Sequence, residues 1–262
     1  MRGERDIFKT TTILIALSFT SILFLSIASL FLIVEPSDIL ISLSSPEMVY
    51  SLKLSVMTAS ISTFLVMLFS IPTGYALSRF EFPGKIIAKS IIDLPIAFPE
   101  LVLGLALLLL FGQTFIGGAL EVLGIQIVFT KTGIVVAQIF TAFPYAVRII
   151  YSTFKDIDPR YEFVSRSLGY GDFETFRKVT LPMARTGLFA STIIAYARCI
   201  GAFGAVLILA GGSYMNTDVL PISLYLNLSY GNLPMAITNG IVLVVISFIA
   251  ILTLEKFEGG HI

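Results

Sequence analysis

The sequence has very few of the residues that staple small extracellular domains or hold metal ions. Of its 262 residues, one is cysteine and one is histidine. A disulfide framework needs pairs of cysteines, so none can form within the chain. Cys199 lies inside an apolar run, where we expect a small core residue. His261 is next to last and has no metal-ligand companions nearby in the sequence.

Charged residues are also scarce. They make up 13% of the chain, whereas hydrophobic residues make up 56% and the mean hydropathy is +0.94. Average soluble domains are about 25% charged. Because a soluble protein could not bury this much apolar surface, the composition predicts an integral membrane protein surrounded by lipid. The formal net charge is zero and basic patches are absent, so we expect no nucleic-acid partner.

Catalytic motifs are missing as well. The run Gly84-Lys85-Ile86 lacks the upstream glycine and the following Ser or Thr of a Walker A motif, so we expect the chain to hydrolyse no ATP itself. Asp156 and Asp158 are two apart, but beside Arg160 a solvated or capping role is the better interpretation. With no triad, carboxylate pair or metal cluster, we predict no enzyme, no cofactor and no metal site.

Six apolar segments are long enough to span a bilayer, for which about 20 residues are needed. We therefore predict an all-α membrane protein that forms one transmembrane domain over residues 1–262. The first segment follows three basic residues, as in a signal peptide, but it has no small-residue cleavage pattern, so we expect a retained span. The predicted spans are residues 13–34, 56–77, 91–111, 133–151, 186–211 and 235–254.

The basic residues predict the orientation, because short cytoplasmic loops carry an excess of Lys and Arg. With both termini inside, only Lys53 and Lys131 lie outside, and Arg198 falls within the fifth span. The outer connections, residues 35–50, 112–130 and 212–233, are otherwise free of Lys and Arg, and residues 218–228 are apolar enough to lie along the membrane surface. The other fourteen of the 17 basic residues are then cytoplasmic: Arg2, Arg5, Lys9, Arg79, Lys85, Lys89, Arg148, Lys155, Arg160, Arg166, Arg177, Lys178, Arg185 and Lys256.

The loop between the fourth and fifth spans, about residues 154–185, contains a polar segment at residues 158–185 that cannot be buried in lipid. We predict a helix at 161–168, a break at Gly169-Tyr170-Gly171, a second helix at 172–179 and a stop at Leu181-Pro182. Asp172 is the predicted N-cap of the second helix. Phe173 and Phe176, three apart, are predicted to form one exposed aromatic face that a soluble partner could grip.

Ionisable residues inside the spans are costly, by at least about 2.5–3.5 kcal/mol each, and so must face protein or water. Asp93 is near the cytoplasmic end of its span and is interpreted as interfacial. Glu100 and Arg198 lie at depths of roughly 14 and 18 Å at about 1.5 Å per residue, so they could pair. The pair would be either a structural lock between the third and fifth spans or part of a transport path.

Two further features mark candidate pathway residues. Pro95 and Pro99 interrupt the third span, which predicts a kink and favours a position beside a water-filled cavity, with a merely kinked packing helix as the alternative. In the fifth span, Gly201 and Gly204 allow helices to approach closely. Between them, Phe203 is a candidate plug for a closed gate, although an aromatic packed in the core is the commoner outcome.

The polar segment resembles the "EAA" loop of ABC importer permeases. The matching residues are Glu162, Arg166-Ser167-Leu168-Gly169 and, twelve residues on, Leu181 with Pro182. Phe163-Val164-Ser165 stand where the family usually has Glu-Ala-Ala. The resemblance implies that residues 170–179 form a coupling helix that docks on an ATPase subunit.

Two other stretches resemble the permeases of molybdate, tungstate and sulfate importers. Leu94-Pro95, Pro99 and Gly104 are similar to their LP…P…G segment, and Ala197-Arg198 with Gly201-Ala202-Phe203-Gly204-Ala205 is similar to their AR…GEFGA segment, with Ala202 where many members have Glu. Thiamine and iron permeases share similar segments, so a permease for another small solute is the alternative.

The resemblance implies a type I ABC importer permease with six transmembrane helices. Such a subunit would form a homodimer around one pathway, bind two copies of an ABC ATPase subunit and receive its oxyanion from an extracytoplasmic binding protein. A secondary transporter is a weaker alternative, because three intramembrane charges and no visible repeat give little support for ion coupling.

Overall fold

The computed structural model describes residues 2–259, and the side chains of residues 7–256. All regular structure in this range is helical. His261 lies outside the described residues. In chain order the helices are α1 (Arg2–Ile33), α2 (Pro36–Leu43), α3 (Pro46–Arg79), α4 (Lys85–Ala97), α5 (Glu100–Gln113), α6 (Phe115–Val122), α7 (Lys131–Asp156), α8 (Arg160–Ser167), α9 (Asp172–Thr175), the π-helix η1 (Phe176–Thr180), α10 (Leu181–Met183), α11 (Arg185–Ile200), α12 (Gly204–Ala210), α13 (Leu220–Ser229) and α14 (Leu233–Gly259).

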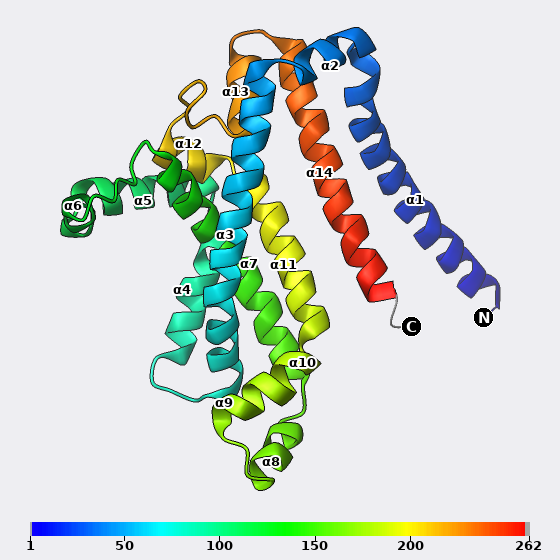
Figure 1. The fold of residues 1–262 in the computed structure, drawn as a ribbon. Helices are drawn as coiled ribbons and strands as arrows, with labels where there is room; N and C mark the ends of the chain where they lie inside the picture. Colours follow the sequence, from blue (N-terminus) through cyan, green and yellow to red (C-terminus); the bar gives the residue numbers. More distant parts are fainter. Residues whose placement is uncertain (1, 260–262) are drawn as a thin grey trace.

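The centre of the molecule is a bundle of α3, α7 and α11, with α14 packed on α11 (Figure 1). Local signals start the long helices: the hydroxyl of Ser45 accepts a hydrogen bond from Met48 N, and that of Thr130 accepts one from Gly133 N. Gly74 lets α3 and α7 approach closely, because a Cβ there would lie 2.6 Å from the side chain of Ile150. These contacts make α3 and α7 the frame for the rest of the chain.

Every predicted span corresponds to helix. Four helices are long and apolar enough to cross a membrane singly, and two bent pairs raise the possible number to six. The single helices contain the predicted segments 13–34 (all but its last residue), 56–77, 133–151 and 235–254. The third and fifth predicted segments fall on the bent pairs α4–α5 and α11–α12.

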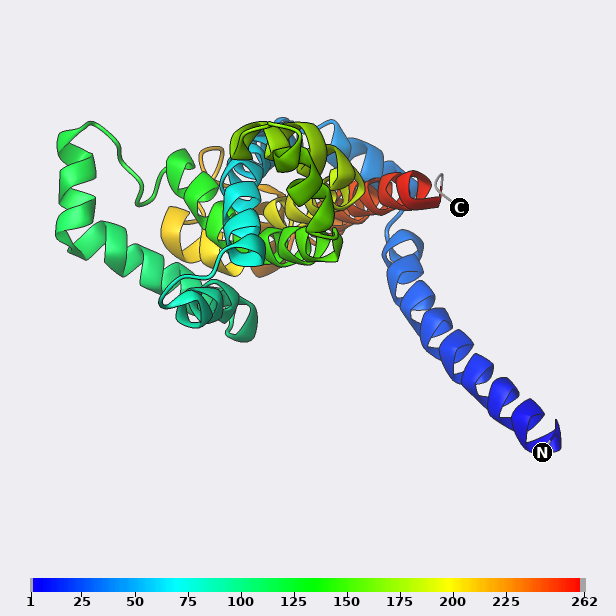
Figure 2. The ribbon, with the colours of Figure 1, turned by 90° about the horizontal axis from the view of Figure 1, so that it is seen from below.

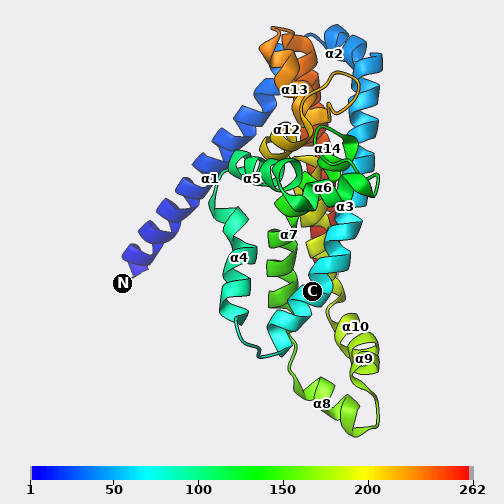
Figure 3. The ribbon, with the colours of Figure 1, turned by 90° about the vertical axis from the view of Figure 1, so that its left-hand side faces the viewer.

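The prediction of one kinked helix for the third segment was wrong. The segment forms two helices, and the chain bends by 119° between them. Pro95 lies within α4, whereas Pro99 is the N-cap of α5, and Phe98 between the helices is extended. Proline disfavours the helical conformation in the residue before it, so Phe98 ends α4 and the chain turns sharply. α4 therefore runs along the bundle while α5 crosses it (Figure 3).

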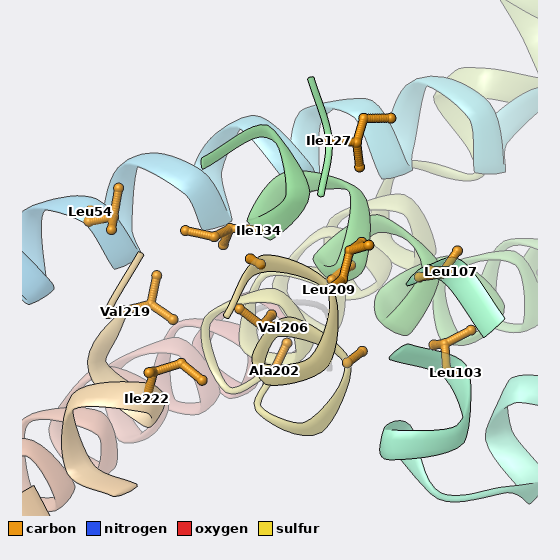
Figure 4. Packing of buried hydrophobic residues seen from close by; sticks show 13 residues of the cluster. Leu54, Leu103, Leu107, Ile127, Ile134, Ala202, Val206, Leu209, Val219 and Ile222 are labelled. Carbon is orange, nitrogen blue, oxygen red and sulfur yellow. The ribbon is translucent and has the colours of Figure 1, made fainter. Parts of the chain in front are cut away.

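The fifth segment bends by 56° at residues 201–203, between α11 and α12. Here the small residues bring helices together, as expected: a Cβ on Gly104 of α5 would lie 2.9 Å from the backbone of Ala205 in α12. Around this contact lies the largest buried apolar cluster, to which α3, α5, α7, α12 and α13 all contribute (Figure 4). The two bends are thus packed against each other.

Two parts of the chain stand away from the bundle. Helix α1 diverges on one side, and α5 with α6 extends on another (Figure 2). Among the described side chains of α1, no residue of its apolar core is fully buried, and the helix makes a small contact with α14. Helix α13, which covers most of the apolar residues 218–228, packs on α14 and α3 with Leu220 and Ile222 buried.

The basic ends of the elements lie together. The start of α1, the α3–α4 connection, the polar segment and the end of α14 all point to the lower end of the molecule in Figure 1, whereas α2 and α13 form the upper end. This arrangement is the one that the distribution of Lys and Arg requires. Which end faces the cytoplasm stays a prediction.

Candidate functional site

The polar segment folds into a helical hairpin at the lower end of the bundle (Figure 1). Helix α8 lies within one residue of its predicted range, and the chain reverses after it at Gly169, whose φ of 93° suits glycine. Gly171, not Asp172 as predicted, is the N-cap of α9. The carboxylate of Asp172 instead accepts a hydrogen bond of 3.3 Å from Arg166.

The predicted second helix does not stop at Leu181-Pro182. Helix α9 continues into η1 and then into α10, with Pro182 in the first turn of α10. Proline has no amide hydrogen to donate to the preceding turn, and the wider π-turn η1 lies directly before it. The segment therefore runs with little interruption into α11.

Glu162 fixes the polar segment to the bundle. It is only 3% exposed, and its Oε1 accepts hydrogen bonds of 2.9 Å from Arg79 Nε and from Thr180 Oγ1. Arg79 Nη2 also donates to the carbonyl of Ile157 at 2.9 Å. One carboxylate thus joins α3, α8 and η1. Arg79 and Thr180 carry no local pattern in the sequence that would have identified them as its partners.

The prediction that Phe173 and Phe176 form one exposed aromatic face was wrong. Phe173 is 73% exposed, but Phe176 packs inward, its ring centroid 4.7 Å from that of Tyr75 and 6.1 Å from that of Phe154. Side chains three apart are about 60° apart around a helix. Spacing alone would keep the two rings on neighbouring parts of one face, but only Phe176 lies at the contact with the ends of α3 and α7. Phe176 is therefore packed on the bundle, and Phe173 is exposed.

An exposed apolar face remains on the polar segment. We define it by the exposed side chains Tyr161, Val164, Leu168 and Tyr170, which border one hollow. Phe163 and Phe173 are exposed as well but do not border that hollow. A hollow of about 630 Å³ lies beside it, bordered by Leu168, Tyr170 and Val179 among others. Apolar side chains gathered at a polar end of a membrane protein mark a site for protein contact.

Polar contacts stiffen this face. The hydroxyls of Ser165 and Thr175 lie 2.9 Å apart and join α8 to α9, and the exposed Ser167 donates to the carbonyl of Phe163. Lys178 donates to Glu174 at 3.2 Å and lies 4.6 Å from the ring centroid of Tyr170. That hydrogen bond and the charge of Lys178 lower the pKa of the Glu174 carboxyl.

Glu100 and Arg198 are not paired. Glu100 Oε2 accepts hydrogen bonds from the backbone amides of Phe203, at 3.3 Å, and Gly204, at 3.2 Å. The prediction of an ion pair was wrong because the bend in the fifth segment exposes the first amides of α12, which need an acceptor. Glu100 supplies it and joins the two bent segments.

The other pathway candidates lie around this contact. The guanidinium of Arg198 is exposed and lies 4.0 Å from the ring centroid of Tyr145 on α7. Gly201 is the exposed C-cap of α11, and a Cβ on the buried Gly204 would lie 3.0 Å from Leu101 N. The Phe203 ring is partly buried, 5.4 Å from that of Tyr225. In the part of the chain that the structure describes, no three carboxylate, His or Cys side chains gather as a metal site would require.

Sequence comparison places the chain among transport proteins. Residues 67–258 match the family model described as binding-protein-dependent transport system inner membrane component. The chain is 35% identical over 190 residues to the molybdate/tungstate transport system permease protein WtpB of Pyrococcus furiosus, covering 72% of this chain and 70% of that protein. It is 33% identical to the sulfate transport system permease protein CysW of a Synechocystis species, with 80% and 78% covered.

Solved structures share the fold. A chain of a bacterial alginate ABC transporter in complex with an alginate pentasaccharide-bound periplasmic protein superposes with a TM-score of 0.76 at 14% identity, over 97% of this chain and 94% of that one. A chain of the MetNI methionine ABC transporter gives a TM-score of 0.60 at 20% identity, over 81% and 96%. The match of the family model over most of the chain decides the assignment: this multi-pass membrane protein belongs to the family of binding-protein-dependent transport system inner membrane components, the permeases of ABC importers.

Proposed function

We propose that this chain is the permease subunit of an ATP-driven importer and forms the translocation pathway for a tetrahedral oxyanion. Molybdate or tungstate is the favoured cargo and sulfate the less favoured one. The relatives named above as molybdate/tungstate and sulfate permeases support this choice. The chain itself is a non-catalytic subunit, and a separate subunit hydrolyses ATP.

The proposed complex contains two copies of this chain, two ABC ATPase subunits and an extracytoplasmic oxyanion-binding protein. The observation that carries the proposal is the polar segment, a rigid hairpin with an exposed apolar face at the basic end of the bundle. By the distribution of Lys and Arg this end is cytoplasmic, where an ATPase subunit would reach it. Phe173 and its exposed neighbours then dock on that subunit.

The anchor contacts explain how movement of the polar segment reaches the spans. Glu162 ties the segment to Arg79 at the end of α3, and Phe176 packs on Tyr75 of α3 and Phe154 of α7. When ATP closes the ATPase dimer, the two copies of the segment are drawn together. Because these contacts are buried, α3 and α7 move with them, the pathway opens outward and the binding protein releases its anion. Hydrolysis returns the spans to the inward-facing arrangement.

The pathway lies beside the two bends, in this proposal. The exposed guanidinium of Arg198 is the charge that meets the anion within the membrane, and Glu100 holds α5 against α12 rather than facing the cargo. A single cation gives weak binding, which suits a pathway because a tight site would trap its cargo. Phe203 and Gly201, next to the bend, are placed where a change in its angle would move them most.

Reconstitution tests the proposal. The chain, its ATPase subunit and its binding protein are placed in liposomes, and uptake of radiolabelled molybdate, tungstate and sulfate is measured with and without ATP. We expect ATP-dependent uptake of at least one oxyanion. Uptake of radiolabelled thiamine and iron is measured in parallel, and uptake of one of these without any oxyanion would assign the chain to another small solute. Uptake by the chain with no ATPase subunit would favour a secondary transporter and contradict the proposal.

A further inference from the structure

A cavity of about 370 Å³ lies between α4 and α7, in the half of the bundle nearest the polar segment. Helix α3 closes its back through Leu77. We propose that this cavity binds a tetrahedral oxyanion group weakly, as a second anion site below Arg198. Its charged and aromatic lining residues are Lys89, Asp93, Arg148, Tyr151, Lys155 and Asp156.

Helical spacing places these residues on the faces of α4 and α7 that line the cavity. Arg148, Tyr151 and Lys155 are three and four residues apart and share one face of α7, and Lys89 and Asp93 are four apart on α4. Charged residues that are more than fifty positions apart in the chain thus line one cavity from two helices. Lys89 and Asp93 are partly buried, whereas Arg148, Lys155 and Asp156 are exposed at the mouth, so the cavity is open to solvent on the side of α7.

Among the described side chains, no carboxylate forms an ion pair with the three cations of the cavity. The ion pairs of the described side chains join other residues, such as Lys85 with Glu81 and Lys178 with Glu174. Instead, the ammonium groups of Lys89 and Lys155 lie 4.2 and 6.0 Å from the ring centroid of Tyr151. The ring therefore gathers two cations from two helices at one place, and both keep their hydrogen-bond donors available for a ligand.

The residues that line the cavity suit an oxyanion and predict that it binds weakly. The guanidinium of Arg148 offers paired donors that match two oxygens of a tetrahedral anion, and the two lysines add point charges. Asp93 and Asp156 offset two of these three charges, leaving a net charge of +1. The cavity is also much larger than one such anion, so the ligand keeps part of its water. Weak binding is what an exit from a pathway requires.

The position relative to Arg198 gives the cavity a role in transport. Tyr145, whose ring faces the guanidinium of Arg198, lies three residues before Arg148 on the same helix face. From Tyr145 to Lys155 this face extends about 15 Å, at about 1.5 Å per residue. An anion that leaves Arg198 would therefore meet the cavity next. This role rests on the proposed function, whereas the binding chemistry does not.

The same chemistry has two sources: the transported anion itself, or the phosphate of an anionic lipid head group. Two measurements on the purified full-length chain distinguish them. Equilibrium dialysis in detergent at low salt gives the affinity for radiolabelled sulfate and molybdate. Native mass spectrometry after purification in the presence of phosphatidylglycerol counts the lipid molecules that stay bound.

Arg148→Gln and Lys89→Gln are the test variants. The matched control is Lys131→Gln, which removes a lysine that also lies over a tyrosine ring, that of Tyr50, at the start of the same helix α7. Loss of one charge-assisted hydrogen bond should weaken binding about tenfold in each test variant and not in the control. The thermal unfolding midpoint of each variant shows that the fold is retained.

Weaker binding of the free anion in the test variants alone supports the proposal with the cargo as ligand. Loss of retained phosphatidylglycerol in the same variants supports it with a lipid phosphate as ligand. If neither ligand binds, or if Lys131→Gln weakens binding as much as the test variants do, the proposal is wrong. Oxyanion uptake by the reconstituted complex is measured separately, so a failure of the proposed function would be seen as absent uptake while the binding result still stands.

Discussion

The carboxylate of Glu162 lies 2.9 Å from Nε of Arg79, although 83 residues separate the two in the chain. Their side chains are only 4% and 9% exposed. Thr180 donates to the same carboxylate oxygen, so one buried acid holds the start of the polar segment, its end and the end of α3 together. The hairpin that meets the proposed partner is therefore part of the bundle and not a loosely hinged loop.

We predict that Glu162→Ala destabilises the protein by about 3–5 kcal/mol, because it leaves the Arg79 guanidinium buried and without its partner. Arg79→Ala should have a similar effect, and the double variant should lose less than the two single losses added together. Denaturant unfolding of the detergent-solubilised chain measures this. Glu174→Ala, which breaks an exposed pair with Lys178, is the control and should change stability far less. Additive losses in the double variant would contradict the pairing.

We expect alanine substitutions at Phe173 and Phe176 to have different effects. Phe176→Ala removes a ring packed on Tyr75 and Phe154 and should lower the free energy of unfolding by up to about 3 kcal/mol. Phe173→Ala should leave the free energy of unfolding unchanged, because its ring is exposed, but should reduce binding of the ATPase subunit. Thermal unfolding and co-purification with the ATPase subunit separate the two effects. A Phe173→Ala protein that unfolds early yet binds the ATPase subunit normally would reverse the assignment.

Glu100 should behave as a helix cap. Glu100→Ala leaves the amides of Phe203 and Gly204 without their acceptor and should cost about 0.5–2 kcal/mol. Glu100→Gln should cost clearly less, because an amide oxygen still accepts a hydrogen bond. Unfolding measurements on these variants, repeated in an Arg198→Gln background, test the interpretation. Strong non-additivity between positions 100 and 198 would show that the two side chains interact after all.

The contact between the two bends should not tolerate extra atoms. Gly104→Ala places a methyl group 2.9 Å from the Ala205 backbone and from the Ile208 side chain, so we expect a loss of about 1–3 kcal/mol. Gly118→Ala in α6 is the matched control, since a methyl group there meets nothing within 4 Å. That variant should be neutral or slightly more stable, because alanine favours helix. Thermal unfolding compares the two, and equal effects would contradict the close packing of α5 on α12.

Local features of the sequence predicted the helices well. Apolar runs specified the spans, and the glycines around Tyr170 specified the reversal after α8, because these signals act within a few residues. The likeness of residues 162–182 to the loop of importer permeases came from the same local pattern, and the family match agrees with it.

Features that depend on distant residues were missed. The direction of the Phe176 ring is decided by Tyr75 and Phe154, and the acceptor for α12 comes from Glu100, which is about one hundred residues away. Proline at position 99 predicted a disturbance, but not that α5 would turn by 119° to pack on α12. Neither spacing nor propensity carries this information, since each depends on which helices are neighbours in space.

The central claim is that the polar segment faces the cytoplasm and is held by a separate ATPase subunit. Its most direct test is labelling of a Phe173→Cys variant with a membrane-impermeant maleimide, in a chain whose natural cysteine, Cys199, is buried. Lys53→Cys, at the opposite end of α3, is the control for the outer side.

We predict that Phe173→Cys reacts in inverted vesicles and not in intact cells, and that Lys53→Cys shows the reverse sidedness. Labelling of Phe173→Cys from outside the cell would contradict the account.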